Sequence, residues 1–300
     1  FFIYYYFIKY TKEKHWYQLV ISALSINLAI LLIGNNLIHL LAIFAVAVIY
    51  FIRNKDWKII AFILSCVFLM SASKSVITNY YEVKSQKEIA EGVPKITWIA
   101  MGMQEGEREA GWWNRFNYDI MPEEEYDEKR ITEISKTSMK QRLNVFRDNP
   151  KYALDFYQRK YENQFIEPTF QSLLVTAPQR NFSNETTLEK IRDFFVKQIY
   201  FNHTHTVLEF IMKVFQVFVY LFTFVFAVVM YKRKNEFFAI IPIAFIGGTL
   251  FNMIWEAKSR YIFPYFVFLI PLAAYGLVIV RNKIKEYKKL KEEKDEKSTI

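Results

Sequence analysis

Six long apolar blocks constrain this chain more than any other feature of its sequence. They occupy residues 16–34, 36–52, 57–73, 207–231, 237–255 and 261–280. Each is long enough, or nearly so, to cross as a helix the hydrocarbon layer of a bilayer, which is about 30 Å thick. None shows the alternation of a β-barrel strand. With 53% hydrophobic residues among 300, the sequence predicts an α-helical polytopic membrane protein with six full spans.

Basic residues mark one side of this predicted bundle. They cluster at residues 9–14, 53–58 and 232–234 and from residue 281 onward, which all fall on one side if every block crosses. Cytoplasmic loops are enriched in Lys and Arg, so we expect this side to be cytoplasmic. The membrane is then expected to be the plasma membrane. The net charge of +9 then reports topology rather than nucleic-acid binding, although a lipid-binding basic tail would use the same lysines.

The blocks divide the chain into four parts. Residues 1–73 form membrane helices, 74–206 an extracytoplasmic domain, 207–280 three further membrane helices, and 281–300 a basic cytoplasmic tail. The apolar run at residues 1–8 is too short to cross, so we expect a partial span with its beginning missing. The chain would then be the C-terminal part of a longer protein.

Residues 74–206 are too many for a simple connection and predict a folded domain. Residues 81–91 favour a helix, and the apolar run 95–101, entered through Pro94, favours a short strand. One helix is expected from Pro122 to about Asp148, and a second starts at Asn149-Pro150 and runs through Tyr161. Thr186 with Glu189 reads as a capping box that begins a third helix. We therefore predict a mixed α/β domain.

Four passages carry a family resemblance. They read PKITWIAMG at 94–102, GWWNRFNYD at 111–119, NQFIEPTF at 163–170 and WEAKSRYIFPY at 255–265. Together they resemble the C-terminal half of bacterial GT-C type membrane glycosyltransferases, the protein-mannosyltransferase-like enzymes often grouped as family 39. The resemblance implies transfer of a sugar from a polyprenyl-phosphate carrier to a glycan or protein acceptor on the outer face. It also implies a catalytic carboxylate in the first outer loop, which no residue of this chain matches.

Three charged residues stand at the start of the last apolar block. Glu256, Lys258 and Arg260 follow an inside-to-outside span, where a polyprenyl phosphate would present its headgroup. Arg pairs two phosphate oxygens through its planar fork and Lys adds a point charge. The alternative is that they are interfacial anchors whose basic stems reach outward, which explains the carboxylate of Glu256 less well.

Aromatic and amide side chains in the outer domain favour sugar binding. A sugar site commonly combines a ring platform with amide and carboxylate groups for the hydroxyls. The candidates are Trp98, Trp112, Trp113, Asn117, Asp119 and Glu167. Tryptophans also build cores, and Glu167 before Pro168 either binds the acceptor or caps a turn.

Cofactor signals are weak. His203 and His205 share a face only in an extended segment, and no Cys or carboxylate stands beside them, so interface histidines are favoured over metal ligands. The sequence contains no phosphate-binding Gly-rich loop and no nucleophile elbow. We expect no cofactor, and a divalent metal is unsupported.

Two other functions remain open. A transporter or flippase would favour ionisable residues deep in several spans, and this chain offers only His39, Glu209 and Lys213. A non-catalytic envelope assembly or scaffold protein would use the outer domain as a binding module. The resemblance favours the glycosyltransferase.

Overall fold

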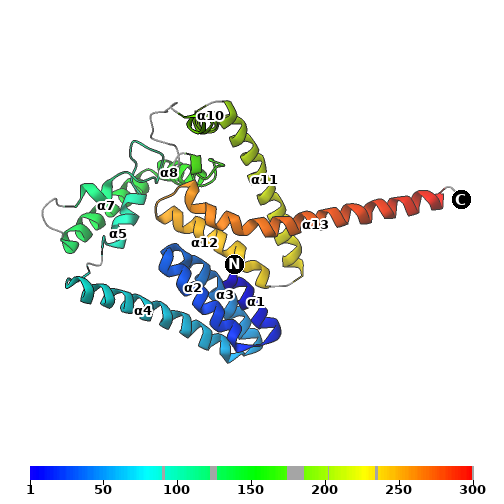
Figure 1. The fold of residues 1–300 in the computed structure, drawn as a ribbon, viewed down its shortest axis with the longest axis horizontal. Coiled ribbons are helices and arrows are strands. Elements are labelled where there is room, and N and C mark those ends of the chain that lie inside the picture. The colour runs from blue at the N-terminus through cyan, green and yellow to red at the C-terminus, as the bar shows by residue number, and fades with distance from the viewer. Residues whose placement is uncertain (90–91, 122–126, 174–185, 202, 234–235, 299–300) are drawn as a thin grey trace.

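The structure is a computed structural model that describes residues 1–89, 92–121, 127–173, 186–201, 203–233 and 236–298. These residues contain twelve α-helices and two short 3-10 helices, with no strand among them (Figure 1). The predicted α-helical membrane protein is confirmed. The prediction of a mixed α/β outer domain is wrong for the described part of the chain.

Helices occupy all six predicted apolar blocks. They are α2 (Trp16–Leu32), α3 (Leu37–Asn54), α4 (Trp57–Ser85), α11 (His203–Lys232), α12 (Ile240–Ile254) and α13 (Ser259–Ser298). Five described segments are long and apolar enough to cross a membrane: Gly34–Asn54, Trp57–Ser85, Thr204–Lys232, Phe237–Ile254 and Ser259–Glu293. The sixth predicted span corresponds to α2, an apolar helix of 17 residues that is about 25 Å long and therefore shorter than the hydrocarbon layer. Its crossing stays a prediction.

The membrane helices pack as two groups joined by α12. In the first, α1 (Phe2–Glu13) lies against α2, and α2 lies against α4. Its core includes the fully buried Phe7, Ile43 and Ile59. In the second, α11 lies along α13, and Gly276 permits that contact, because a Cβ there would stand 2.0 Å from the carbonyl oxygen of Phe222. Helix α12 contacts both α3 and α13 and so connects the two groups.

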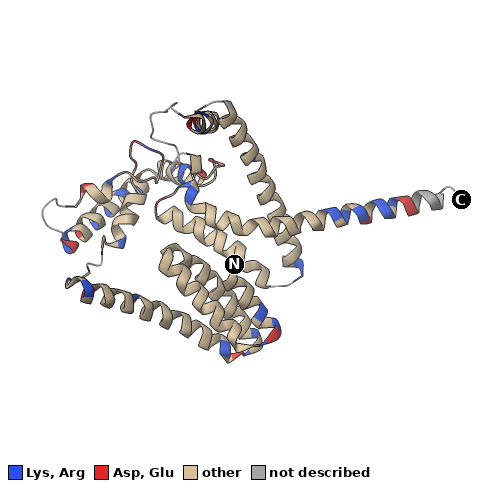
Figure 2. Cartoon of the chain, in the orientation of Figure 1, with Lys and Arg blue, Asp and Glu red and all other residues tan. Residues whose placement is uncertain are grey.

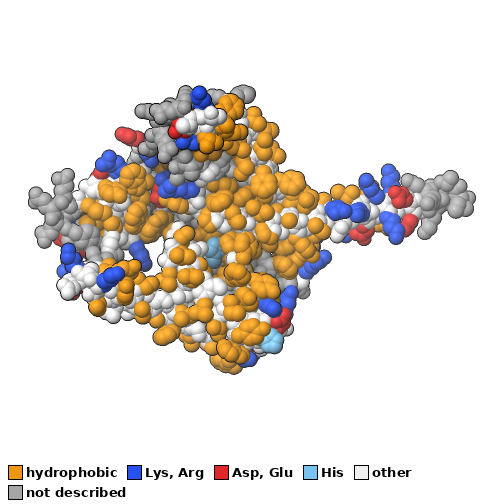
Figure 3. Space-filling view, viewed as in Figure 1, with side chains coloured by type: hydrophobic (Ala, Val, Ile, Leu, Met, Phe, Trp, Pro, Cys, Tyr) orange, Lys and Arg blue, Asp and Glu red, His pale blue; other side chains and the backbone are white. Residues whose placement is uncertain are grey.

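Charged residues gather at the ends of the membrane helices. Figure 2 shows basic residues at the turns after α1 and α3, at the end of α11 and along the extension of α13. These positions lie away from the helices between α4 and α11, as the alternation of spans requires. On the face drawn in Figure 3, hydrophobic side chains cover the membrane helices, as expected of surfaces that meet lipid.

The connection between α4 and α11 is helical. It contains α5 (Lys95–Gly102), α6 (Phe116–Asp119), α7 (Glu128–Asp148), α8 (Pro150–Glu162) and α10 (Thr187–Phe201). The predicted strand at 95–101 is therefore helix α5. A short apolar run does not distinguish a strand from a buried helix, and here Thr97, Ala100 and Met101 are buried at helical spacing while α5 packs on α7.

Several predicted helix ends are confirmed by their caps. The capping box is present, since the N–H of Glu189 donates to Thr186 Oγ1 at 3.2 Å and the N–H of Thr186 donates to Glu189 Oε2 at 3.0 Å. Asn149 caps α8 through the N–H of Tyr152 at 3.1 Å. The predicted helix start at residues 122–125 lies outside the described residues, and α7 begins instead at Glu128, capped by Asp127.

Helix α4 runs past its predicted end at residue 73. It continues to Ser85, so residues 81–85 of the helix expected at 81–91 belong to α4. No proline or glycine interrupts residues 57–85, and nothing in that stretch stops the helix at the edge of the apolar block.

Candidate functional site

The short turn between α12 and α13 carries the three charged residues that the sequence singled out. Glu256 and Lys258 are buried, with exposed fractions of 6% and 7%, whereas Arg260 is exposed. Lys258 Nζ lies 2.5 Å from Glu256 Oε1 in an ion pair. The turn thus presents one cation outward and holds a second one against a carboxylate inside.

The Glu256 carboxylate joins the turn to the helical segment between α4 and α11. Its Oε1 accepts the backbone N–H of Trp113 at 3.2 Å, and its Oε2 accepts the hydroxyl of Tyr261 at 2.8 Å. Next to it, the N–H of Ala257 donates to the carbonyl oxygen of Gly111 at 2.9 Å. A buried ion pair requires such additional hydrogen bonds, because the Coulomb attraction alone does not offset the desolvation of both charges.

Lys258 is enclosed by the same segment. Its ammonium lies over the ring of Trp112, 5.4 Å from the centroid, which is a cation–π distance. The expected contact of Glu256 and Lys258 with a lipid phosphate stays a prediction. In this structure both side chains hold the helical segment between α4 and α11 to the turn.

Arg260 differs from its two neighbours because it reaches solvent. Its Nη2 donates to the Tyr261 hydroxyl at 3.0 Å, and its guanidinium lies 5.0 Å from the centroid of the same ring. It also lines a pocket of about 260 Å³. The other residues that line it are Thr169, Phe170, Ser172, Leu173, Leu208, Met212 and Phe263. Arg260 therefore places a cation at an apolar pocket between α11 and α13.

Lys160 is a buried charge that the sequence analysis missed. Its exposed fraction is 0%, its Nζ donates to the carbonyl oxygen of Gly102 at 2.5 Å, and its stem covers Gly111, where a Cβ would stand 2.6 Å from Lys160 Cε. Burial lowers the Lys160 pKa to about 7, against the opposing attraction of Glu256. Its spacing of four residues from the fully buried Phe156 is the signal that places it on the inner face of α8.

The predicted sugar-binding residues fall into two groups. Trp98 stacks on Trp255 at 6.3 Å between ring centroids. Trp113 is half-buried, and its Nε1–H donates to Oδ1 of the buried Asn117 at 2.9 Å. Asp119 lies apart on the surface, 3.9 Å from Arg115. The rings of Trp98 and Trp112 thus lie against Trp255 and Lys258 at the charged turn. Trp113 meets the turn through its backbone N–H, while Asp119 faces solvent.

Glu167 caps a turn that precedes the membrane helices. Its Oε1 accepts the N–H of Thr169 at 2.9 Å, and its Oε2 accepts the N–H of Gln171. These bonds stabilise left-handed backbone at Phe170 and Gln171, which have φ of 54° and 59°. The Ser259 hydroxyl donates to Glu167 Oε2 at 3.4 Å. The capping role is therefore present, and acceptor binding stays a prediction.

Of the two histidines, the His203 side chain lies outside the part that the structure describes, and only His205 has a described contact. His205 Nε2 lies 3.3 Å from Glu209 Oε1 in a contact along α11. No group of three His, Cys, Asp or Glu side chains in the described part of the chain is arranged to hold a metal ion.

One family model matches nearly the whole chain. It is described as conserved hypothetical integral membrane protein, and it matches residues 1–278. The chain belongs to this family. The match includes the turn at Glu256–Arg260, the helical segment between α4 and α11, and the predicted membrane helices through residue 278. Neither the curated proteins nor the solved structures gave a match.

Proposed function

We propose that this integral membrane protein takes part in sugar transfer from a polyprenyl-phosphate carrier to an acceptor on the outer face of the membrane. The observation that carries the proposal is the exposed Arg260 beside an apolar pocket at the end of α13. A lipid phosphate needs a cation next to an apolar surface, and Arg pairs phosphate oxygens in a bidentate way.

The neighbouring ion pair has a positioning role in this proposal. The Glu256 carboxylate accepts the hydroxyl of Tyr261, and the same hydroxyl accepts from Arg260. The chain Glu256–Tyr261–Arg260 therefore orients the guanidinium toward its ligand. A catalytic base is not assigned to any residue of this chain.

The proposed orientation follows from the basic helix ends. With the turns after α1 and α3 and the extension of α13 in the cytoplasm (Figure 2), the turn at Glu256–Arg260 lies at the outer face. The C-terminus is then cytoplasmic, in a bacterial plasma membrane. Cysteine accessibility on intact cells, with single cysteines at the exposed Asp119 and Lys285 in a Cys66→Ser background, should label the first and spare the second.

The transfer proposal is tested by Arg260→Gln in the full-length protein. A charge-assisted hydrogen bond contributes about 1.5–3 kcal/mol, so kcat/KM for sugar transfer from polyprenyl phosphate in membrane vesicles should fall about 10- to 100-fold. Arg147→Gln is the matched control, because Arg147 is exposed on α7 and pairs only with its neighbour Asp148 in the described structure. Equal transfer by wild type and Arg260→Gln would remove Arg260 from the mechanism.

A further inference from the structure

The outer half of α4 leaves the helix bundle. The buried residues of α4 are Ile59, Phe62 and Cys66, all in its first half. Beyond them, Asn27 Nδ2 of α2 donates a hydrogen bond to Ser73 Oγ at 2.8 Å. From there α4 continues to Ser85 and leans away from the other membrane helices (Figure 1).

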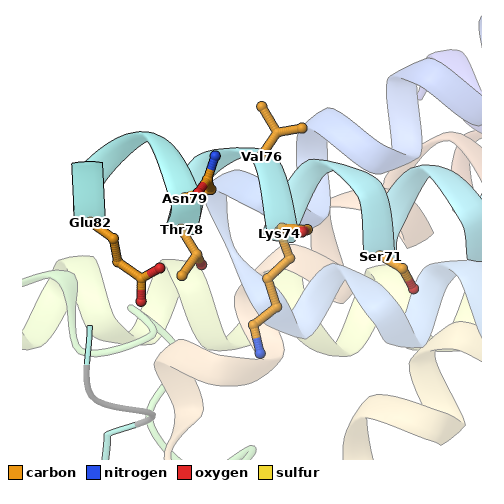
Figure 4. A pocket seen from close by; sticks show the side chains of 7 residues that line it. Ser71, Lys74, Val76, Thr78, Asn79 and Glu82 are labelled. Carbon is orange, nitrogen blue, oxygen red and sulfur yellow. The ribbon is translucent and has the colours of Figure 1, made fainter. Parts of the chain in front are cut away.

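A polar face begins where this packing ends. Ser71, Lys74, Ser75, Thr78 and Glu82 recur at helical spacing and line a groove of about 620 Å³ together with Val76 and Asn79. In Figure 4, the side chains of Ser71, Lys74, Thr78 and Glu82 project from the same side of α4. The spacing of three and four residues explains this shared face.

This polar face lies within the membrane or at its edge. Helix α4 begins at Trp57, beside the basic turn that holds Lys55 and Lys58. At 1.5 Å per residue, Ser71 lies about 21 Å and Thr78 about 32 Å along the helix from Trp57. With a hydrocarbon layer of about 30 Å, the face occupies the outer third of the bilayer and its boundary, and the lean of α4 brings it deeper.

Polar groups at that depth require partners, and no carboxylate in the part of the chain that the structure describes pairs with the cation of this face. Among the described residues, no carboxylate forms an ion pair with Lys74, and the Glu82 carboxylate accepts only the N–H of Ile89, at 3.1 Å. Ionisable side chains inside a membrane commonly mark a binding site, because an unpaired charge there is costly. The missing partner should carry negative charge and face the outer leaflet.

The same side of α4 is apolar one turn deeper. Leu64, Val67 and Phe68 stand at helical spacing below Ser71, with exposed fractions of 63%, 51% and 69%. A ligand that follows this side therefore meets hydrocarbon surface first and then a cation, hydroxyls and a carboxylate. A lipid has this order of chemistry from its chain to its headgroup.

We infer that this face of α4 binds an outer-leaflet lipid whose headgroup combines a phosphate with a polyol or sugar. Lys74 pairs with the phosphate, while the hydroxyls of Ser71, Ser75 and Thr78 donate to its oxygens. The Glu82 carboxylate accepts from headgroup hydroxyls. The site is separate from Arg260 and does not require the transfer reaction.

Native mass spectrometry of the full chain tests this site, with phosphatidylglycerol as the probe and phosphatidylcholine as competitor. Arg260→Gln is the background, so that phosphate binding at the end of α13 does not contribute. In that background we expect preferential retention of one phosphatidylglycerol. Lys74→Gln should weaken it about tenfold, the loss of one charge-assisted hydrogen bond, and Lys74→Arg should keep it.

The matched control is Lys84→Gln, which removes a charge from the same helix at a lysine that lies 5.7 Å from the ring of Tyr80. It should leave retention unchanged. Three results would overturn the inference: retention that survives Lys74→Gln, an equal loss in Lys84→Gln, or equal retention of phosphatidylcholine. Displacement by soluble glycerol phosphate at the same concentration would also overturn it, because the acyl chains of the lipid would then contribute nothing to binding.

Discussion

Because Lys160 is buried, we predict that the free energy of unfolding of the protein increases as the pH rises. Burial lowers the pKa of its ammonium from 10.5 to about 7, with Glu256 acting in the opposite direction. The difference, 10.5 − 7 = 3.5, corresponds to a free energy of about 5 kcal/mol at 1.36 kcal/mol per pKa unit. Between these two pH values the unfolded state binds more protons than the folded state, so the free energy of unfolding increases with pH.

The pH range of this effect distinguishes Lys160 from the carboxylates whose protonation causes acid denaturation. The stabilisation is fully present above pH 10.5 and is lost as the pH falls to about 7, the folded-state pKa. From pH 7 to pH 9 the gain should be about 2 kcal/mol, because the full slope of about 1.4 kcal/mol per pH unit is reached only well above the folded-state pKa. At pH 7, replacement of Lys160 by methionine should therefore stabilise the protein, since an apolar side chain of similar length removes the buried charge.

Thermal unfolding in detergent across this pH range is the assay, comparing wild type with Lys160→Met. The difference between the two melting temperatures should shrink as the pH rises, because only the wild type carries the titrating group. Lys151→Met is the control, since Lys151 is exposed on the same helix and should leave the pH dependence unchanged. Parallel curves for wild type and Lys160→Met would refute the reasoning.

Two further predictions concern packing and charge at the membrane helices. Glu256→Gln leaves Lys258 buried without its charged partner and should lower the free energy of unfolding by about 3–5 kcal/mol. The double variant Glu256→Gln with Lys258→Met should recover much of this loss. If Glu256→Gln alone were as stable as wild type in thermal unfolding, the prediction would be contradicted. Gly276→Val forces α11 and α13 apart at the carbonyl of Phe222 and should destabilise by about 1–3 kcal/mol or more. Gly34→Ala, with nothing within 4 Å of its Cβ, should melt like wild type, and equal melting of both glycine variants would count against the packing argument.

The sequence predicted the membrane helices because length and hydropathy act locally. A block such as 207–231 is apolar over enough residues to require a helix in lipid, and α11 matches it. The capping box at Thr186 and the helix boundary at Asn149 and Pro150 were equally local, since each depends on residues within a few positions. These features needed no knowledge of the rest of the fold.

The remaining features depend on contacts between distant parts of the chain. The run at 95–101 forms a helix that packs on α7. This contact cannot be predicted from the residues of the run alone. The charged turn pointed to a site at Glu256 and Lys258, but their burial results from Trp112 and Trp113, more than 140 positions away. Lys160 was missed because a lysine is rarely placed in a core.

Helix α13 has the charged turn at one end and the basic tail at the other. Its 40 residues run from Ser259 to Ser298, with Pro264 and Pro271 inside the helix, over a length of about 60 Å. A tilt of about 5° at the end near the turn would displace the far end sideways by about 5 Å at this length. A protein or surface that binds the basic tail would therefore act on the same helix that carries Arg260 at its other end.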